Sequence, residues 1–183
     1  LVNFLNALLS AGCILFLFWS ITRLVRSLIV NEEQNLSTID VIVILGSGFV
    51  GALAYTFSDT FWFSAVEGEV YAFSSFLTAL VFWMILRWQD ESDSVYGDRW
   101  IILIAYIIGL SIGVHLLNLL CIPAIVLVFY YQKYHAISFK GVAAAIVISG
   151  LLIVFILFVY IPGIADMGGW FELLFVNVFG LPF

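Results

Sequence analysis

The stretch WIILIAYIIGLSIGVHLLNLLCIPAIVLVFYY, residues 100–131, decides the fold. As one helix it would be about 48 Å long, well beyond the hydrocarbon core of a bilayer, which is about 30 Å thick. Residues that break helices or carry polar groups interrupt it: Gly109, Gly113, His115, Asn118 and Pro123. We therefore predict two short helices that meet near residues 114–117.

The basic residues favour the same division. When the stretch forms two helices, all the Lys and Arg residues of the chain fall on one side of the membrane: Arg23, Arg26, Arg87, Arg99, Lys133 and Lys140. With a single helix, the two lysines would change sides. Because cytoplasmic loops are enriched in Lys and Arg, we predict six spans, with these loops cytoplasmic and both ends of the chain external.

The composition of the whole chain agrees with a membrane protein. Of its 183 residues, 64% are hydrophobic and only 10% are charged, whereas soluble domains carry about 25% charged residues. Other spans are expected at residues 4–22, 39–57, 70–86 and 142–160, and the tail 161–183 is expected at the membrane interface. The predicted fold class is an all-α polytopic bundle of about six transmembrane helices, forming a single transmembrane domain over residues 1–183.

These features also exclude some functions. A soluble enzyme is excluded by the apolar composition, and nucleic acid is excluded as a partner because the six basic residues form no cluster. The lipid bilayer is the expected partner. Cys13 and Cys121 fall inside apolar spans, so we interpret both as packing residues rather than a disulfide. No signal peptide is recognised, and the natural protein is expected to begin upstream of Leu1.

One motif suggests a nucleotide site that the context rules out. Residues 46–51, GSGFVG, match the dinucleotide-binding fingerprint. That motif needs a soluble strand–turn–helix unit, and the surrounding membrane spans leave no room for one. Small residues at these positions instead suit close packing between helices in lipid.

The acidic segment 58–71, SDTFWFSAVEGEVY, contains the strongest candidates for chemistry. Ser58 or Asp59 can cap a helix that starts on the external side. Glu67 and Glu69, on one helix, would lie about 200° apart and could not face one cavity. An ionised acid at membrane depth is costly unless it faces water or a partner. Either these acids are solvated in a loop, or at least one binds a substrate, a metal or a catalytic proton.

A second candidate pair lies at the turn in the deciding stretch. His115 and Asn118 are three residues apart, so on a helix they share one face. They either cap a helix and make interhelical hydrogen bonds, or line an external recess. Asp166 could reach the same recess. The other loop acids are expected to be solvated: Glu32, Glu33, Asp90, Glu91, Asp93 and Asp98.

Two motifs resemble one bacterial family of multi-pass proteins. Residues 61–71, FWFSAVEGEVY, resemble the start of its third or fourth helix, and residues 109–118, GLSIGVHLLN, resemble a later turn. That family is similar to protein O-mannosyltransferases and belongs to the GT-C glycosyltransferases. Glu69 matches its acid before an aromatic or apolar pair, and His115 matches the histidine after Gly-Leu-Ser.

The resemblance implies a membrane glycosyltransferase with a GT-C-like fold, in the cell inner membrane, with its site facing the periplasmic or external side. Such an enzyme would move a mannose-like sugar from a polyprenyl-phosphate donor to a protein or glycan acceptor. The family's catalytic acid is expected in a first external loop, and nothing here matches that loop. The chain is therefore expected to be a fragment whose catalytic base lies upstream of Leu1.

The chemistry also needs a group that holds the leaving phosphate, usually Arg, Lys, His or a metal. The predicted external face has no Arg or Lys, so either a divalent metal bridges acids and phosphate or missing parts supply the cation; no metal ligand is assigned. A transporter or channel subunit and a non-catalytic accessory subunit remain alternatives. The candidate substrate-binding residues are Glu69, His115, Glu67, Tyr71, Asn118, Asp59 and Trp62.

Overall fold

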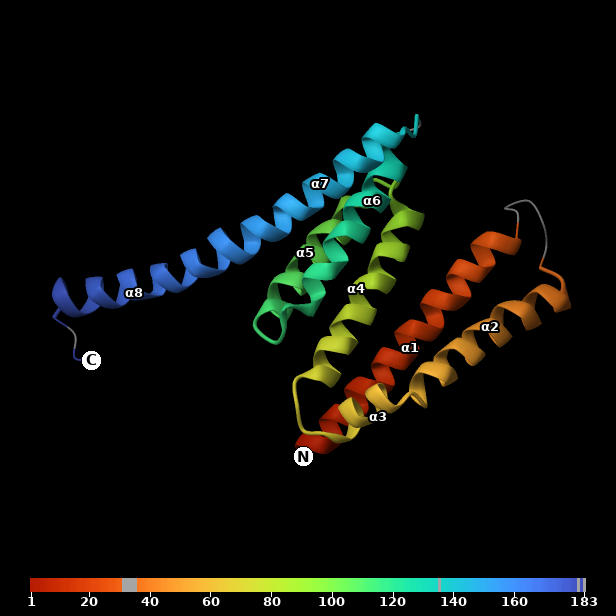
Figure 1. Cartoon of the computed structure of the whole chain (residues 1–183), viewed down its shortest axis with the longest axis horizontal. Coiled ribbons are helices and arrows are strands. Elements are labelled where there is room, and N and C mark those ends of the chain that lie inside the picture. The colour runs from red at the N-terminus through yellow and green to blue at the C-terminus, as the bar shows by residue number, and fades with distance from the viewer. Residues whose placement is uncertain (31–35, 135, 181, 183) are drawn as a thin grey trace. The chain divides into compact units, whose positions relative to one another are not determined.

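The computed structural model describes residues 1–30, 36–134, 136–180 and 182, and this part of the chain is helical with short turns and no strand (Figure 1). The all-α prediction is confirmed. The polar residues 31–35, which include Glu32 and Glu33, lie outside the described residues. The elements are α1 (Val2–Ile29), α2 (Thr38–Thr56), α3 (Asp59–Val66), α4 (Tyr71–Glu91), α5 (Asp98–Ile112), η1 (Leu116–Leu120), α6 (Cys121–Lys133), α7 (Phe139–Phe155), η2 (Ile156–Tyr160) and α8 (Ile161–Asn177).

Within the described residues, five helical segments are long and apolar enough to cross a membrane. They are α1, α2, α4, the segment Leu116–Lys133 and the segment Phe139–Asn177. The division of residues 100–131 into two short helices is confirmed. The first of them, α5, has only 15 residues and spans about 22 Å, which explains why five segments rather than six reach full length.

The described residues cluster into two compact units, unit 1 (Leu1–Cys121) and unit 2 (Ile122–Phe183). A single transmembrane domain over the whole chain stays a prediction. In unit 1, α1 packs against both α2 and α4, and α5 packs against α4. The short helix α3 lies beside the start of α1 and leads into α4 (Figure 1).

The glycine motif of residues 46–51 lies inside α2 and serves helix packing. Gly48 is buried, and a Cβ atom there would collide with the side chains of Thr22 and Phe18 on α1. A Cβ atom at Gly51 would come within 2.6 Å of Ile21 Cδ1, also on α1. The expectation of close helix packing is thus confirmed, and the nucleotide-binding motif is a chance match.

Charged residues tie the helices together at the end of unit 1 where α1 and α4 finish. Arg23 on α1 forms an ion pair with Asp90 on α4. Arg87 pairs with Glu91 at 2.7 Å, and the indole of Trp100 donates to the other oxygen of Glu91 at 2.8 Å. The prediction that Asp90 and Glu91 lie in a loop is wrong, although Asp90 is exposed and Glu91 partly exposed. Both end a helix and hold neighbouring helices, which sequence spacing alone does not reveal.

In unit 2, the predicted interfacial tail is helical. α7, η2 and α8 follow one another without a break as the segment Phe139–Asn177, about 58 Å long at about 1.5 Å per residue. A π-helical turn, η2, comes where the ring of Pro162 would clash with the carbonyl of Phe158 in an α-helix. One proline and three glycines of the tail were therefore insufficient to stop the helix at Tyr160: Pro162, Gly163, Gly168 and Gly169.

Candidate functional site

One end of unit 1 gathers most of the candidate residues. Here α1 begins, α3 leads into α4, and α5 turns into η1 (Figure 1). We call this the acidic end and define it by Asp59, Glu67, Glu69, Tyr71 and His115. The basic residues of unit 1 lie at the opposite ends of the same helices, at Arg23, Arg26, Arg87 and Arg99. The acidic end therefore has none of the arginines of unit 1, whereas the opposite end carries both these arginines and acids such as Asp90 and Glu91.

Glu67 and Glu69 lie in a loop rather than on a helix. Glu67 ends α3 in an extended conformation, with φ −78° and ψ 137°, and α4 begins only at Tyr71. The predicted separation of about 200° around a helix is therefore wrong. Gly68 between the two acids breaks the helical continuity that the sequence argument assumed. Both carboxylate side chains are exposed.

The backbone of this loop is held by a residue that the sequence analysis missed. The side-chain amide of Asn6, on α1, donates to the carbonyl of Glu67 and, at 3.1 Å, to the carbonyl of Glu69. Asn6 is only 6% exposed. The sequence did contain a sign of this role, since Asn6 is a polar residue inside the first predicted span. A polar amide that is removed from water needs a hydrogen-bond partner.

Tyr71 and His115 meet at the acidic end. Their rings lie 5.7 Å apart, although Tyr71 starts α4 and His115 precedes η1. His115 caps η1, since its Nδ1 accepts a hydrogen bond of 3.1 Å from the backbone N–H of Leu117. In the neutral imidazole the proton therefore resides on Nε2, which is left as a donor. The helix cap, one of the two roles expected for His115, is therefore present. It leaves Nε2 available for another hydrogen bond.

Asn118 lies within η1 and is buried, at 1% exposed. Neither its amide nitrogen nor its carbonyl oxygen has a hydrogen-bond partner among the described residues. It therefore does not face lipid, but it does not line an open recess either. A buried amide of this kind is costly unless water or a ligand completes its hydrogen bonds.

The remaining candidates lie on α3. Asp59 and Trp62 both lie in its first turn, and both residues are exposed. Ser58 precedes the helix but makes no side-chain cap. Tyr55 at the end of α2 contacts Phe61 at 4.6 Å between ring centroids, which fixes α3 against the bundle. The structure thus brings Glu69, Tyr71 and His115 to one end, with Asp59 and Trp62 on the adjoining helix.

The described residues of the acidic end do not form a set of side chains that could bind a metal ion. Among residues 1–30, 36–134, 136–180 and 182, no group of three or more His, Cys, Asp or Glu side chains could hold a metal ion. A divalent cation would thus need ligands beyond these side chains, such as the phosphate of a substrate.

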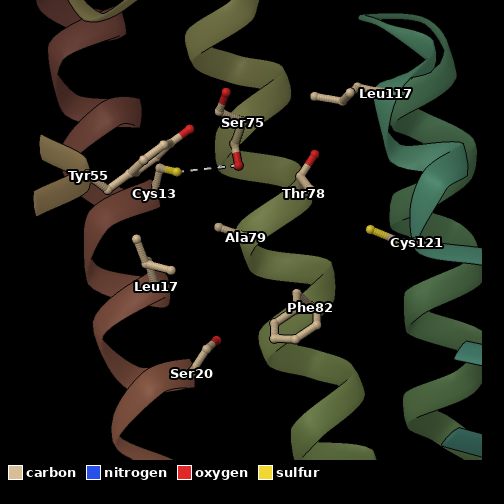
Figure 2. A pocket seen from close by; sticks show the side chains of 10 residues that line it. All are labelled: Cys13, Leu17, Ser20, Tyr55, Ser75, Thr78, Ala79, Phe82, Leu117 and Cys121. Atoms are coloured by element: carbon tan, nitrogen blue, oxygen red, sulfur yellow. Dashed lines mark hydrogen bonds between the residues drawn. The ribbon is translucent and has the colours of Figure 1, made fainter. Parts of the chain in front are cut away.

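A cavity of about 320 Å³ lies deeper in unit 1 between α1, α4 and the start of α6 (Figure 2). The thiol of Cys13 contacts the carbonyl of Ser75 at 3.5 Å. Both cysteines are free and buried, as the packing interpretation requires, but both also line this cavity. Its lining is mostly apolar and comprises Cys13, Leu17, Ser20, Tyr55, Ser75, Thr78, Ala79, Phe82, Leu117 and Cys121.

Comparison with known proteins assigns the family. The sequence model of the family described as "Protein O-mannosyl-transferase TMEM260 N-terminal domain" matches residues 1–138. The chain belongs to this family. The matched region contains all of unit 1 and the acidic end. No curated protein and no solved structure matches the chain.

Membership of the TMEM260 N-terminal domain family identifies a membrane protein of a protein O-mannosyltransferase type. The match agrees with the resemblance drawn from residues 61–71 and 109–118, which both lie within it.

Proposed function

We propose that this chain forms the helical core of a membrane glycosyltransferase that moves a mannose-like sugar from a polyprenyl-phosphate donor to a protein or glycan acceptor. In this proposal the fold is of the GT-C type, the acidic end of unit 1 holds the substrates, and that end faces the external or periplasmic side. The observation that carries the proposal is the placement of the Glu69 loop beside the Tyr71–His115 pair at one end of helices whose family is a protein O-mannosyltransferase family.

The reaction requires simple bond changes. The acceptor hydroxyl oxygen bonds to the anomeric carbon of the sugar, and the bond from that carbon to the phosphate oxygen breaks. The polyprenyl phosphate leaves with the electron pair, and a general base takes the acceptor proton. We assign supporting roles, and not the role of this base, to the residues of the acidic end.

The residues of the acidic end suit the supporting roles. The exposed Glu69 carboxylate can accept hydrogen bonds from sugar or acceptor hydroxyls. The Nε2–H of His115 can donate to a phosphate oxygen, because Nδ1 is already engaged with Leu117. Tyr71 places an aromatic ring beside the imidazole of His115. The arrangement therefore places hydrogen-bond donors and acceptors at one end of an apolar helix bundle.

A direct transfer assay tests the proposal. Membranes containing the complete protein are supplied with radiolabelled mannosyl-phosphate polyprenol, and label bound to protein or glycan is counted against membranes without it. The proposal expects transfer well above that control. Label that stays in the lipid fraction, at the level of the control membranes, would contradict it. Movement of intact donor across the membrane without transfer would instead support the transporter alternative.

A further inference from the structure

We propose that Asn6 is a positioning residue that fixes the Glu69 loop for sugar transfer. Its side chain crosses from α1 to the loop between α3 and α4 and holds the backbone on both sides of Gly68. This inference rests on the proposed role of Glu69 and adds a residue on a different helix to the same site.

The hydrogen bonds use the full donor capacity of the amide. The Nδ2 atom of an asparagine carries two N–H groups, and the two carbonyls of Glu67 and Glu69 accept them. Because Asn6 is buried, these hydrogen bonds are protected from competing water, and each is electrostatically stronger than a hydrogen bond at the surface. The carbonyls face α1, while both carboxylates remain exposed.

A second contact places the loop against the first turn of α1. A Cβ atom added at Gly68 would lie 3.3 Å from both Asn3 Oδ1 and Val2 Cγ1. The first turn of α1 is therefore in close contact with the loop backbone. Asn6, one turn further along α1, hydrogen-bonds to the same loop. Together they leave the loop little freedom to shift toward or away from Tyr71.

The competing explanation is that Asn6 is only a polar contact between helices, as occurs in many membrane proteins. The two explanations differ in what depends on Asn6. A general packing contact would affect folding of the whole bundle, whereas a positioning residue affects the loop and, through Glu69, the transfer step.

The first measurement is local and independent of activity. Hydrogen exchange of the Glu67 amide, which donates to the carbonyl of Phe63, is compared in the complete wild-type protein and in Asn6→Ala, with Asn6→Gln as the variant that retains the donor. Ser10→Ala is the matched control, because Ser10 is buried on α1 and its hydroxyl has no partner in the described residues. We expect about tenfold faster exchange in Asn6→Ala, partial recovery in Asn6→Gln and no change in Ser10→Ala. Unchanged exchange in Asn6→Ala, or an equal change in the control, would overturn the proposal.

The second measurement is a double-mutant cycle in the transfer assay. Asn6→Ala should lower transfer about fivefold in the wild type and less than about twofold in Glu69→Gln, because residues that act through one another are not additive. An equal loss in both backgrounds would show that Asn6 does not act through Glu69. If Glu69→Gln were itself fully active, the proposed role of Glu69 would fail, while the exchange experiment would still decide whether Asn6 holds the loop.

Discussion

The ring of Tyr71, at the first residue of α4, lies 5.7 Å from the ring of His115, whose Nδ1 caps η1. The contact joins the start of α4, just after the loop that carries Glu67 and Glu69, to the turn between α5 and η1. His115 caps η1 through Nδ1, and we propose that its Nε2 acts as a hydrogen-bond donor to the substrate.

The two roles of His115 can be separated by mutation. His115→Asn should keep the cap, because asparagine is among the best N-cap residues, but it removes the imidazole donor. We expect His115→Asn to unfold at a temperature close to that of the wild type, measured in detergent, and to transfer sugar at least about tenfold more slowly. His115→Ala should lose both properties. Full transfer by His115→Asn would mean that His115 is only a cap.

The close contact of α1 with α2 predicts a difference between two neighbouring glycines. Gly48→Leu places a side chain where Thr22 and Phe18 already lie, whereas nothing lies within 4 Å of a Cβ atom at Gly46. We expect Gly48→Leu to destabilise the protein by about 1–3 kcal/mol, the usual cost of overpacking, and Gly46→Leu to be tolerated. Thermal unfolding of both variants measures this. Equal tolerance of the two substitutions would argue against the packing of α1 on α2.

The Arg23–Asp90 pair predicts recovery by exchange of charges. Both side chains are partly exposed, at 28% and 31%, so Asp90→Arg alone should cost about 1 kcal/mol or somewhat more through loss of attraction and gain of repulsion. The double variant Arg23→Asp with Asp90→Arg should regain much of the unfolding temperature. If the double variant is no more stable than Asp90→Arg, the two residues are not a pair in the membrane.

The proposed orientation is tested by cysteine labelling of intact cells with a reagent that does not cross the membrane. Thr60→Cys, at the acidic end, should react from outside, whereas Ser94→Cys, at the end with the arginines, should be protected until the membrane is opened. The reverse pattern would place the acidic end in the cytoplasm.

The sequence predicted much of the fold because hydropathy and breaking residues are local signals. The division of residues 100–131 and the packing role of Gly48 followed directly from length, composition and small side chains. The continuation of α7 through Pro162 did not, because a π-helical turn accommodates the proline at a cost that sequence does not show.

The site was less predictable because its contacts join distant segments. Glu69, Tyr71 and His115 were selected by type and by family resemblance, but their placement together depends on how α4 and η1 pack. Asn6 was missed because its partners are backbone carbonyls more than sixty residues away, which carry no side-chain signature. The pairing of Asp90 with Arg23 was not predicted because these two residues are also far apart in the sequence.

The most direct test of the account compares Glu69→Gln with Glu67→Gln in the complete protein. Glu69 lies two residues before Tyr71, whereas Glu67 ends α3. We predict that Glu69→Gln lowers sugar transfer at least about tenfold, equivalent to about 1.4 kcal/mol of transition-state stabilisation, with unchanged membrane insertion. Glu67→Gln should lower transfer less. Equal and full transfer by both variants would contradict the account and show that these acids are merely solvated.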